Sequence, residues 1–273
     1  MSDPLSLVAL GAVVGGAAGK FVEKAWDSGE KWLASYFANH RAKALDRARE
    51  NAAEFLREVA GEIDEQTKRR ALPLDILESA QDHPDFSATL QRALISAAET
   101  ESTEKHKLLA RLIGERLAVG PDSTLAVASK MACDAIAFAT VAQLKILGLQ
   151  ANLLVIRPAE RLSVEEFTDW LSVRLTPYVG VPIHHIDLLH LEAISCGRYE
   201  QFLSRKLLDV LAEKNGTAFD HGRLQLAGVR PYILRVWQEG LQSFNLTSVG
   251  QIIGIYVSDL LSDSHTDLEN WGG

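Results

Sequence analysis

Residues 72–149 read LPLDILESAQDHPDFSATLQRALISAAETESTEKHKLLARLIGERLAVGPDSTLAVASKMACDAIAFATVAQLKILGL, and the rest of the chain is organised around this stretch. Pro73, Pro84 and the Gly120-Pro121 pair divide it into segments of helix length. Within these segments, apolar residues recur at helical spacing: Leu108, Leu109, Leu112, Ile113 and Leu117, then Leu125, Ala128, Ala132, Ala135, Ile136 and Ala139. The stretch therefore predicts a helical core.

A long charged helix or pair of helices is expected before this core, from Ser28 to Arg70. Its apolar stripe comprises Leu45, Ala48, Ala52, Phe55, Leu56, Val59 and Ile63. On the other face, basic and acidic side chains nearly balance, which is typical of a helix face in contact with solvent. Trp26 and Trp32 precede the stripe, and we expect them either at a membrane interface or in the protein core.

Shorter elements are expected after the core. Ser163 and Glu166 form a capping box that begins one helix, and the pattern of Tyr199 to Lys214 predicts another. The β-branched and aliphatic residues of 152–156 favour a short strand. Residues 231–244 fit either a helix or two short strands.

The expected fold class is mostly α: a multi-helix bundle with a long N-terminal helical arm, and with a short β-hairpin as an option in the C-terminal third. We expect three parts. Residues 1–70 hold an apolar N-terminal helix and the long charged helix, residues 71–158 a central helical bundle, and residues 159–273 a C-terminal helical subdomain. A chain of 273 residues with 47% hydrophobic content can bury cores of this size.

The N-terminal run Leu5–Gly19 has no charged residue, and it carries Gly11, Gly15 and Gly19 at intervals of four. Small residues at this interval form a smooth strip for close helix contact, as in membrane helix pairs. Each glycine costs a helix in water about 1 kcal/mol relative to alanine, so the run needs shelter. Three surroundings could bury the run: a membrane, a second copy of the chain, or the protein's own core. In a membrane, the Lys20 side chain would reach the head groups.

Composition narrows the choice of partners and compartment. The formal net charge of −8 opposes non-specific binding to nucleic acid, so no nucleic-acid partner is predicted. Cys133 and Cys196 lie in apolar helical segments and are expected as buried, reduced thiols. The acidic start, Met1 to Pro4, differs from the basic start of a secretory signal. We therefore expect a cytoplasmic protein, with peripheral attachment to the inner membrane as an option, and with protein partners or further copies of itself.

Chemical motifs are scarce. His184, Asp187 and His190 belong to the densest group of potential metal ligands, but a helix that binds zinc through two histidines needs them four residues apart. We therefore expect no metal and no cofactor, and these three residues remain the weak candidates. The chain has no Gly-x-Ser-x-Gly, His-Glu-x-x-His or Cys-x-x-Cys motif, so no catalytic residue is assigned.

Several short motifs carry a family resemblance. They are LLARLIGERL at 108–117, followed by the Gly-Pro-Asp-Ser break at 120–123, AQLKILGL at 142–149, LTSVGQIIG at 246–254 and DLENW at 267–271. In these motifs the chain resembles uncharacterised bacterial helical proteins allied to the Abi-alpha (abortive infection) type families. The resemblance implies a mostly helical prokaryotic protein linked to phage defence, and it brings no catalytic residues with it.

Three functional hypotheses follow. The first is a non-enzymatic bacterial protein that acts in phage defence and that associates with membrane or self-assembles through its glycine-spaced N-terminus. The second is a cytoplasmic helical interaction or regulatory module whose N-terminus packs in its own core. The third is an uncharted nuclease or hydrolase, which would require a cleft containing carboxylates or histidines of perturbed pKa.

Overall fold

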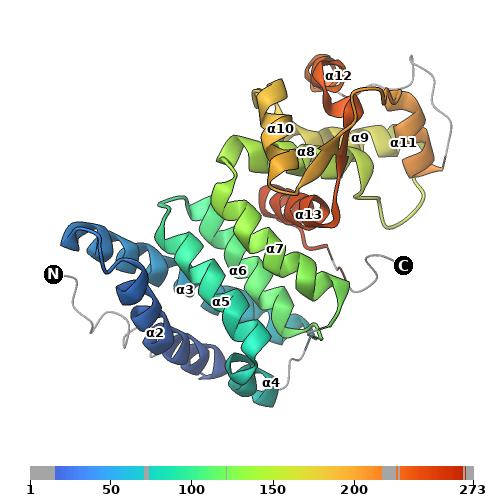
Figure 1. Ribbon diagram of the computed structural model, residues 1–273. Helices are drawn as coiled ribbons and strands as arrows, with labels where there is room; N and C mark the ends of the chain where they lie inside the picture. The colour runs from blue at the N-terminus through green and yellow to red at the C-terminus, as the bar shows by residue number, and fades with distance from the viewer. Residues whose placement is uncertain are drawn as a thin grey trace. The chain divides into compact units, whose positions relative to one another are not determined.

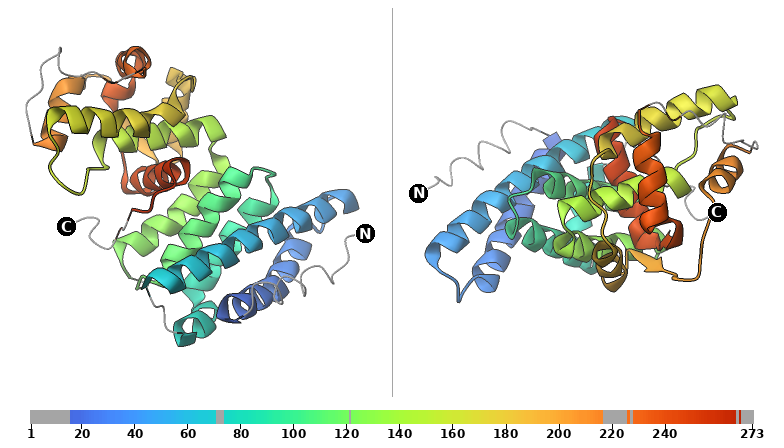
Figure 2. Two further views of the ribbon diagram at one scale, coloured as in Figure 1. Left: turned by 180° about the vertical axis from the view of Figure 1, so that it is seen from behind. Right: turned by 90° about the horizontal axis from the view of Figure 1, so that it is seen from above.

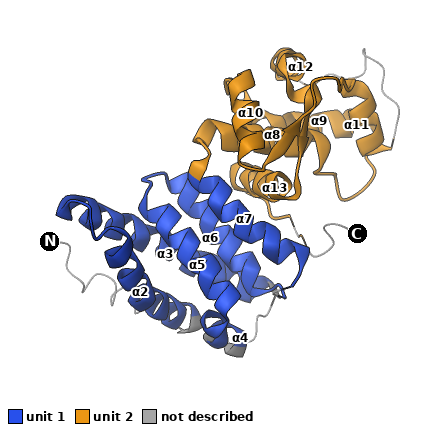
Figure 3. Ribbon diagram, in the orientation of Figure 1, with its two compact units in different colours: residues 1–137 blue, residues 138–273 orange. Residues whose placement is uncertain are grey.

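The structure is a computed structural model, and it divides into two compact units, residues 1–137 and residues 138–273 (Figure 3). It describes residues 16–70, 74–120, 122–216, 226, 228–266 and 268. Each unit has its own buried core.

Unit 1 is built around α3 (Ala42–Arg70), against which α2 (Gly16–Tyr36), α5 (Pro84–Ala98) and α6 (Thr103–Leu117) pack (Figure 1). The remaining elements are α4 (Leu74–Ser79), the 3-10 helix η1 (Ala80–Asp82) and α7 (Thr124–Phe138). The predicted apolar stripes explain the packing, because the stripe residues of α6 and all those of α3 except the half-buried Leu45 are buried.

The N-terminal helix α2 lies beside α3 (Figure 2) and also contacts α4 and α5. Phe21 meets Phe86 of α5 edge to face, with ring centroids 6.0 Å apart, and Ala25 and Leu33 are fully buried. The described part of α2 therefore shelters its apolar face on its own unit.

Unit 2 is centred on α8 (Val141–Leu154) and α13 (Ser248–Ser262). Glycine permits their close approach, because a Cβ atom on Gly254 would lie 2.5 Å from the carbonyl oxygen of Leu147. The unit also contains α9 (Val164–Leu175), η2 (Thr176–Tyr178), α10 (His185–Ala193), β1 (Gly197–Tyr199), α11 (Leu207–Asn215), α12 (Arg230–Glu239), η3 (Leu241–Ser243) and β2 (Phe244–Leu246).

The expected fold class is confirmed: the protein is mostly helical, with one two-stranded antiparallel sheet in its C-terminal third. In that sheet, Gly197 of β1 pairs with Leu246 of β2, and Tyr199 pairs with Phe244. A side chain on Gly197 would run into the ring of Phe244, so glycine is needed there. The Ser163 capping box is also confirmed, since its hydroxyl accepts a hydrogen bond from the Glu166 amide at 3.2 Å.

Two local predictions are wrong. The strand favoured at 152–156 does not form, because the buried Asn152 side chain is satisfied by hydrogen bonds while its backbone remains in α8. The helix expected from Tyr199 begins only at Leu207, because Tyr199 pairs in the sheet.

The two units also differ from the three-part division that we expected, with boundaries near residues 70 and 158. Helix α3, which ends at Arg70, packs on α5 and α6 of the same unit. Helix α8 precedes residue 158 and packs on α9, α11 and α13. Long-range helix contacts therefore place the division between residues 137 and 138.

Candidate functional site

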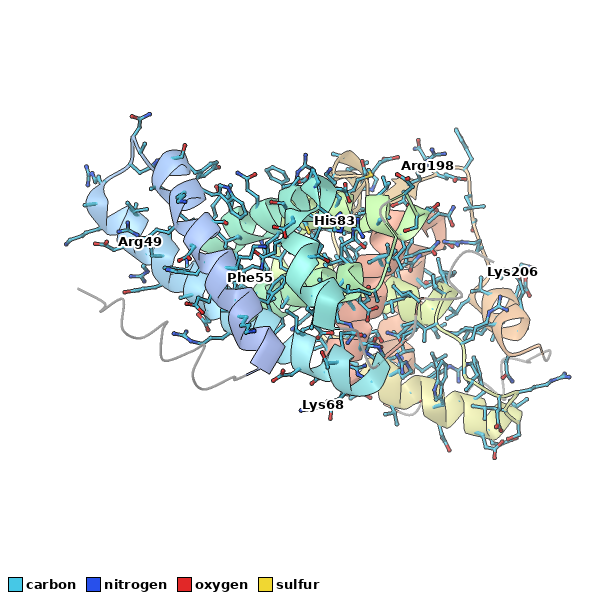
Figure 4. All side chains as sticks on the ribbon, turned by 90° about the horizontal axis from the view of Figure 1, so that it is seen from below. Arg49, Phe55, Lys68, His83, Arg198 and Lys206 are labelled. Carbon is cyan, nitrogen blue, oxygen red and sulfur yellow. The ribbon has the colours of Figure 1, made fainter. Side chains whose placement is uncertain are left out.

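A pocket of about 190 Å³ lies in unit 1, between the start of α5 and the end of α6. Its apolar walls are Ile76, Ala80, Phe86, Leu117 and Val119. Its polar lining residues are Ser79, His83, Asp85 and Arg116, of which His83 is labelled in Figure 4. A largely apolar concave site with a few convergent polar groups is the usual form of a small-molecule site.

Local sequence places the first polar residues at this pocket. Pro84 occupies the first turn of α5, where its missing amide hydrogen costs no helical hydrogen bond. His83 is the N-cap residue of α5, and Asp85 lies one position inside Pro84. From there the Asp85 carboxylate reaches two basic side chains.

These basic side chains are Arg116 and Lys130. Arg116, only 4% exposed, donates from Nη2 to Asp85 Oδ2 and from Nη1 to the Val119 carbonyl at 2.5 Å. Lys130 Nζ donates to Asp85 Oδ1 at 3.3 Å. The hydrogen bond from Arg116 holds the pKa of Asp85 below its ordinary value, so the carboxylate is charged at neutral pH.

One donor in this cluster is unsatisfied. Arg116 Nε is buried and has no hydrogen-bond partner among the described residues. A buried donor without an acceptor costs about 1–3 kcal/mol, so such a group marks a position where an acceptor would bind favourably. No local sequence pattern points to this role, because Arg116 is one charged residue in an ordinary amphipathic helix.

The glycine strip predicted from the sequence lies only partly in the described residues. Gly11 and Gly15 lie outside them, whereas Gly19 is buried in α2 and Lys20 is exposed. Trp26 and Trp32 are half-buried on the same helix. Within the described ranges, no helix combines the length and the apolar content needed to cross a membrane.

The weak metal candidates lie close together around Gln143 of α8. Asp187 accepts hydrogen bonds from the His184 backbone amide at 3.0 Å and from Gln143 Nε2 at 3.1 Å. His190 Nδ1 lies 3.0 Å from Gln143 Oε1. These contacts give Asp187 a capping role for α10. In the part of the chain that the structure describes, no three His, Cys, Asp or Glu residues are grouped to hold a metal ion.

A buried polar cluster in unit 2 was not predicted. Asn152 Nδ2 donates to the Gly148 carbonyl at 2.9 Å, to Ser258 Oγ at 2.8 Å and to the Tyr178 hydroxyl at 3.2 Å. Arg174 donates to Asn152 Oδ1 at 2.8 Å and to Ser258 Oγ at 2.9 Å. Burial raises the pKa of Tyr178 to about 12. The cluster links α8, α9, η2 and α13 through hydrogen bonds.

Residues 19–228 match the model of one uncharacterised protein family, whose description reads only ":-like". The chain belongs to this family. The match extends from α2 through α11, so it includes every residue lining the unit 1 pocket. No curated protein and no solved structure gives a significant match.

Proposed function

We propose that this protein is a non-enzymatic helical interaction and regulatory module whose unit 1 pocket binds a small carboxylate with an apolar body. The observation that carries the proposal is that Arg116, whose buried Nε has no acceptor within the described residues, is one of the residues lining an apolar pocket. A ligand oxygen that accepts from Nε would satisfy this donor.

Charge favours a carboxylate over a neutral acceptor. Arg116 and Lys130 carry two positive charges and Asp85 one negative charge, which leaves this cluster with a formal charge of +1. The lowered pKa of Asp85 keeps this balance at neutral pH. A carboxylate would bring the cluster to neutrality, and a charge-assisted hydrogen bond is stronger than a neutral one.

The size of the pocket limits the apolar body of the ligand. An engineered apolar protein cavity of about 150 Å³ binds benzene. The pocket here measures about 190 Å³, so one ring with a short acidic arm fits the available volume. Phenylacetate is a probe of this form, and phenylacetamide is its uncharged counterpart.

The packing of α2 supports the proposal that the protein is a regulatory module. Phe21, Ala25 and Leu33 are buried within unit 1, and Gln81 of η1 donates to the Phe21 carbonyl at 2.8 Å. The N-terminal helix is thus attached to η1, whose Ala80 lines the pocket. A ligand at the start of α5 would contact a helix that already packs on α2.

Calorimetric titration of the full chain with phenylacetate and phenylacetamide tests the proposal. At the ligand efficiency of ordinary small molecules, phenylacetate should bind with a Kd of about 1 mM, and phenylacetamide more weakly. Arg116→Lys keeps the positive charge but removes Nε, and it should weaken phenylacetate binding and reduce the preference over phenylacetamide. Arg47→Lys, at an exposed pair with Glu101, is the matched control and should bind as the wild type does.

Filling the pocket gives a second test. Val119→Phe should weaken phenylacetate binding at least tenfold, because Val119 lines the pocket. Ala118→Phe adds the same ring at the neighbouring exposed position, which does not line the pocket, and should leave binding unchanged. Equal binding by wild type and Val119→Phe would show that phenylacetate binds elsewhere, and the proposal would be abandoned.

Self-assembly or membrane association through Gly11, Gly15 and Gly19 stays a prediction, as does the link to Abi-alpha type families and phage defence. Vesicle flotation and sedimentation of the full chain test the first of these. A Gly15→Leu variant that floats or assembles as the wild type does would refute the glycine-strip hypothesis.

A further inference from the structure

Lys214, near the C-terminal end of α11, is a buried lysine that the proposed function does not use. Its residue surface is 6% exposed, and Nζ donates a hydrogen bond to the backbone carbonyl of Asn152. The amine lies 5.1 Å from the centroid of the Trp170 ring. The Arg174 guanidinium lies 5.5 Å from the same centroid, so an amine and a guanidinium share one aromatic ring.

The surroundings of this amine favour its neutral form. Within the described ranges, no carboxylate lies within ion-pair distance of Lys214 Nζ. Burial, followed by the positive charges of Arg174 and Arg157, holds the pKa of Lys214 well below its ordinary value. A neutral lysine has a lone pair on nitrogen and is a nucleophile, whereas an ammonium ion is not.

We propose that Lys214 is a carboxylation site, whose buried amine reacts with carbon dioxide to form a carbamate. The nitrogen lone pair forms the N–C bond, and the electron pair of one C=O π bond moves to its oxygen. The amine loses one proton to solvent, so an amine and CO₂ give a carbamate anion and H⁺ with no change of oxidation state. Dissolved CO₂ is the only co-reactant.

The local charges suit this product. Arg174 and Arg157 are positive and Asp259 is negative, so the cluster has a formal charge of +1 while Lys214 is neutral. A carbamate adds one negative charge and brings the sum to zero. Arg174 uses Nε and Nη2 in its hydrogen bonds to Asn152 and Ser258, and across the described ranges its Nη1 has no partner. That group can donate to a carbamate oxygen.

The small size of the reagent suits a buried amine. CO₂ is uncharged and has three atoms, so it enters a packed site more readily than an aldehyde with an organic body. The half-buried Trp170 and Arg174 place one side of the cluster near solvent. Carboxylation would replace the hydrogen bond to Asn152 with contacts to guanidinium groups.

The test uses the full folded chain equilibrated with ¹³C-labelled bicarbonate and CO₂. A trialkyloxonium salt converts carbamates to stable esters, and mass spectrometry of the digested protein locates them. We expect the labelled ester on Lys214. Lys206, the N-cap residue of the same helix and labelled in Figure 4, is exposed and should remain unlabelled.

Two variants separate carboxylation from a purely structural role. Lys214→Met should remove the label, and circular dichroism of this variant checks its helical content. Arg157→Gln changes an exposed side chain outside the hydrogen-bonded cluster, so the fold should be retained. Its labelling should fall about two- to fivefold, as expected for the loss of one exposed charge.

Three results would overturn the proposal: no label on Lys214, equal label on Lys206 and Lys214, or an unchanged label in Arg157→Gln. In each case Lys214 would serve only as a hydrogen-bond donor to the end of α8. None of these results depends on ligand binding in unit 1, so the two proposals fail separately.

Discussion

Gly254→Ala tests the close packing of α13 on α8. A Cβ atom at position 254 would lie 2.5 Å from the carbonyl oxygen of Leu147, 0.9 Å inside the 3.4 Å at which ordinary contact begins. The obstructing atom belongs to the helix backbone, so no rotamer change can remove the clash. Overpacking of this kind costs about 3 kcal/mol at the upper end of its range. The higher helix propensity of alanine offsets about 1 kcal/mol of this cost. We therefore expect a net loss of about 2 kcal/mol from unit 2.

Gly61→Ala supplies the matched control in unit 1. Gly61 lies within α3, and a Cβ atom there would meet nothing within 4 Å. The same substitution should therefore stabilise unit 1 by about 1 kcal/mol through helix propensity alone. The opposite signs of the two effects distinguish steric packing from propensity.

Urea denaturation followed by circular dichroism measures both changes, and native-state hydrogen exchange assigns each to its unit. Amides of α8 and α13 should lose protection in Gly254→Ala, whereas those of α3 gain protection in Gly61→Ala. If Gly254→Ala unfolds at the wild-type urea concentration, α13 does not approach α8 as closely as described, and the reasoning is refuted.

Three further predictions concern single groups. The Asp85 carboxylate, whose pKa Arg116 lowers, should stabilise unit 1 above its unfolded pKa near 4, and this contribution should disappear as the pH falls through its folded pKa. Urea titrations at pH 7 and pH 3 should show that acid lowers the free energy of unfolding less in Asp85→Asn than in the wild type. An equal decrease in both proteins would contradict this prediction. Ser163→Ala should cost about 1 kcal/mol of unfolding free energy in urea, whereas no change would mean that the cap is unimportant. Burial raises the pKa of Cys133 and Cys196 to about 12, so iodoacetamide should alkylate them at pH 8 only after denaturation, as mass spectrometry would reveal.

Much of the fold follows from local patterns that the sequence displays. The α6 stripe from Leu108 to Leu117 is buried as predicted, because apolar residues at helical spacing must face a common core. Ser163 begins α9 because its cap uses residues three positions apart. Such signals lie within one or two helical turns, so they can be found without knowing what packs against them.

The pocket depends on longer-range contacts. Asp85 meets Arg116 across 31 residues and Lys130 across 45 residues, and nothing in the local pattern of any of the three predicts these partners. Lys214 similarly meets Asn152 across 62 residues. Each of these residues alone resembles an ordinary polar position on an amphipathic helix, and only tertiary packing converts it into part of a cluster.

Glycine shows how the same residue type supports two different inferences. The even spacing of Gly11, Gly15 and Gly19 predicts a contact strip, because periodicity is the one property of glycine that a sequence displays. Gly250 and Gly254 are also four residues apart, and in the folded protein a methyl group on Gly254 would strike the Leu147 carbonyl of α8. What makes glycine necessary is an atom of another segment at the position of the missing Cβ. A glycine spaced for contact is therefore a hypothesis about an unseen neighbour, whereas the need for Gly254 follows from a neighbour already in place.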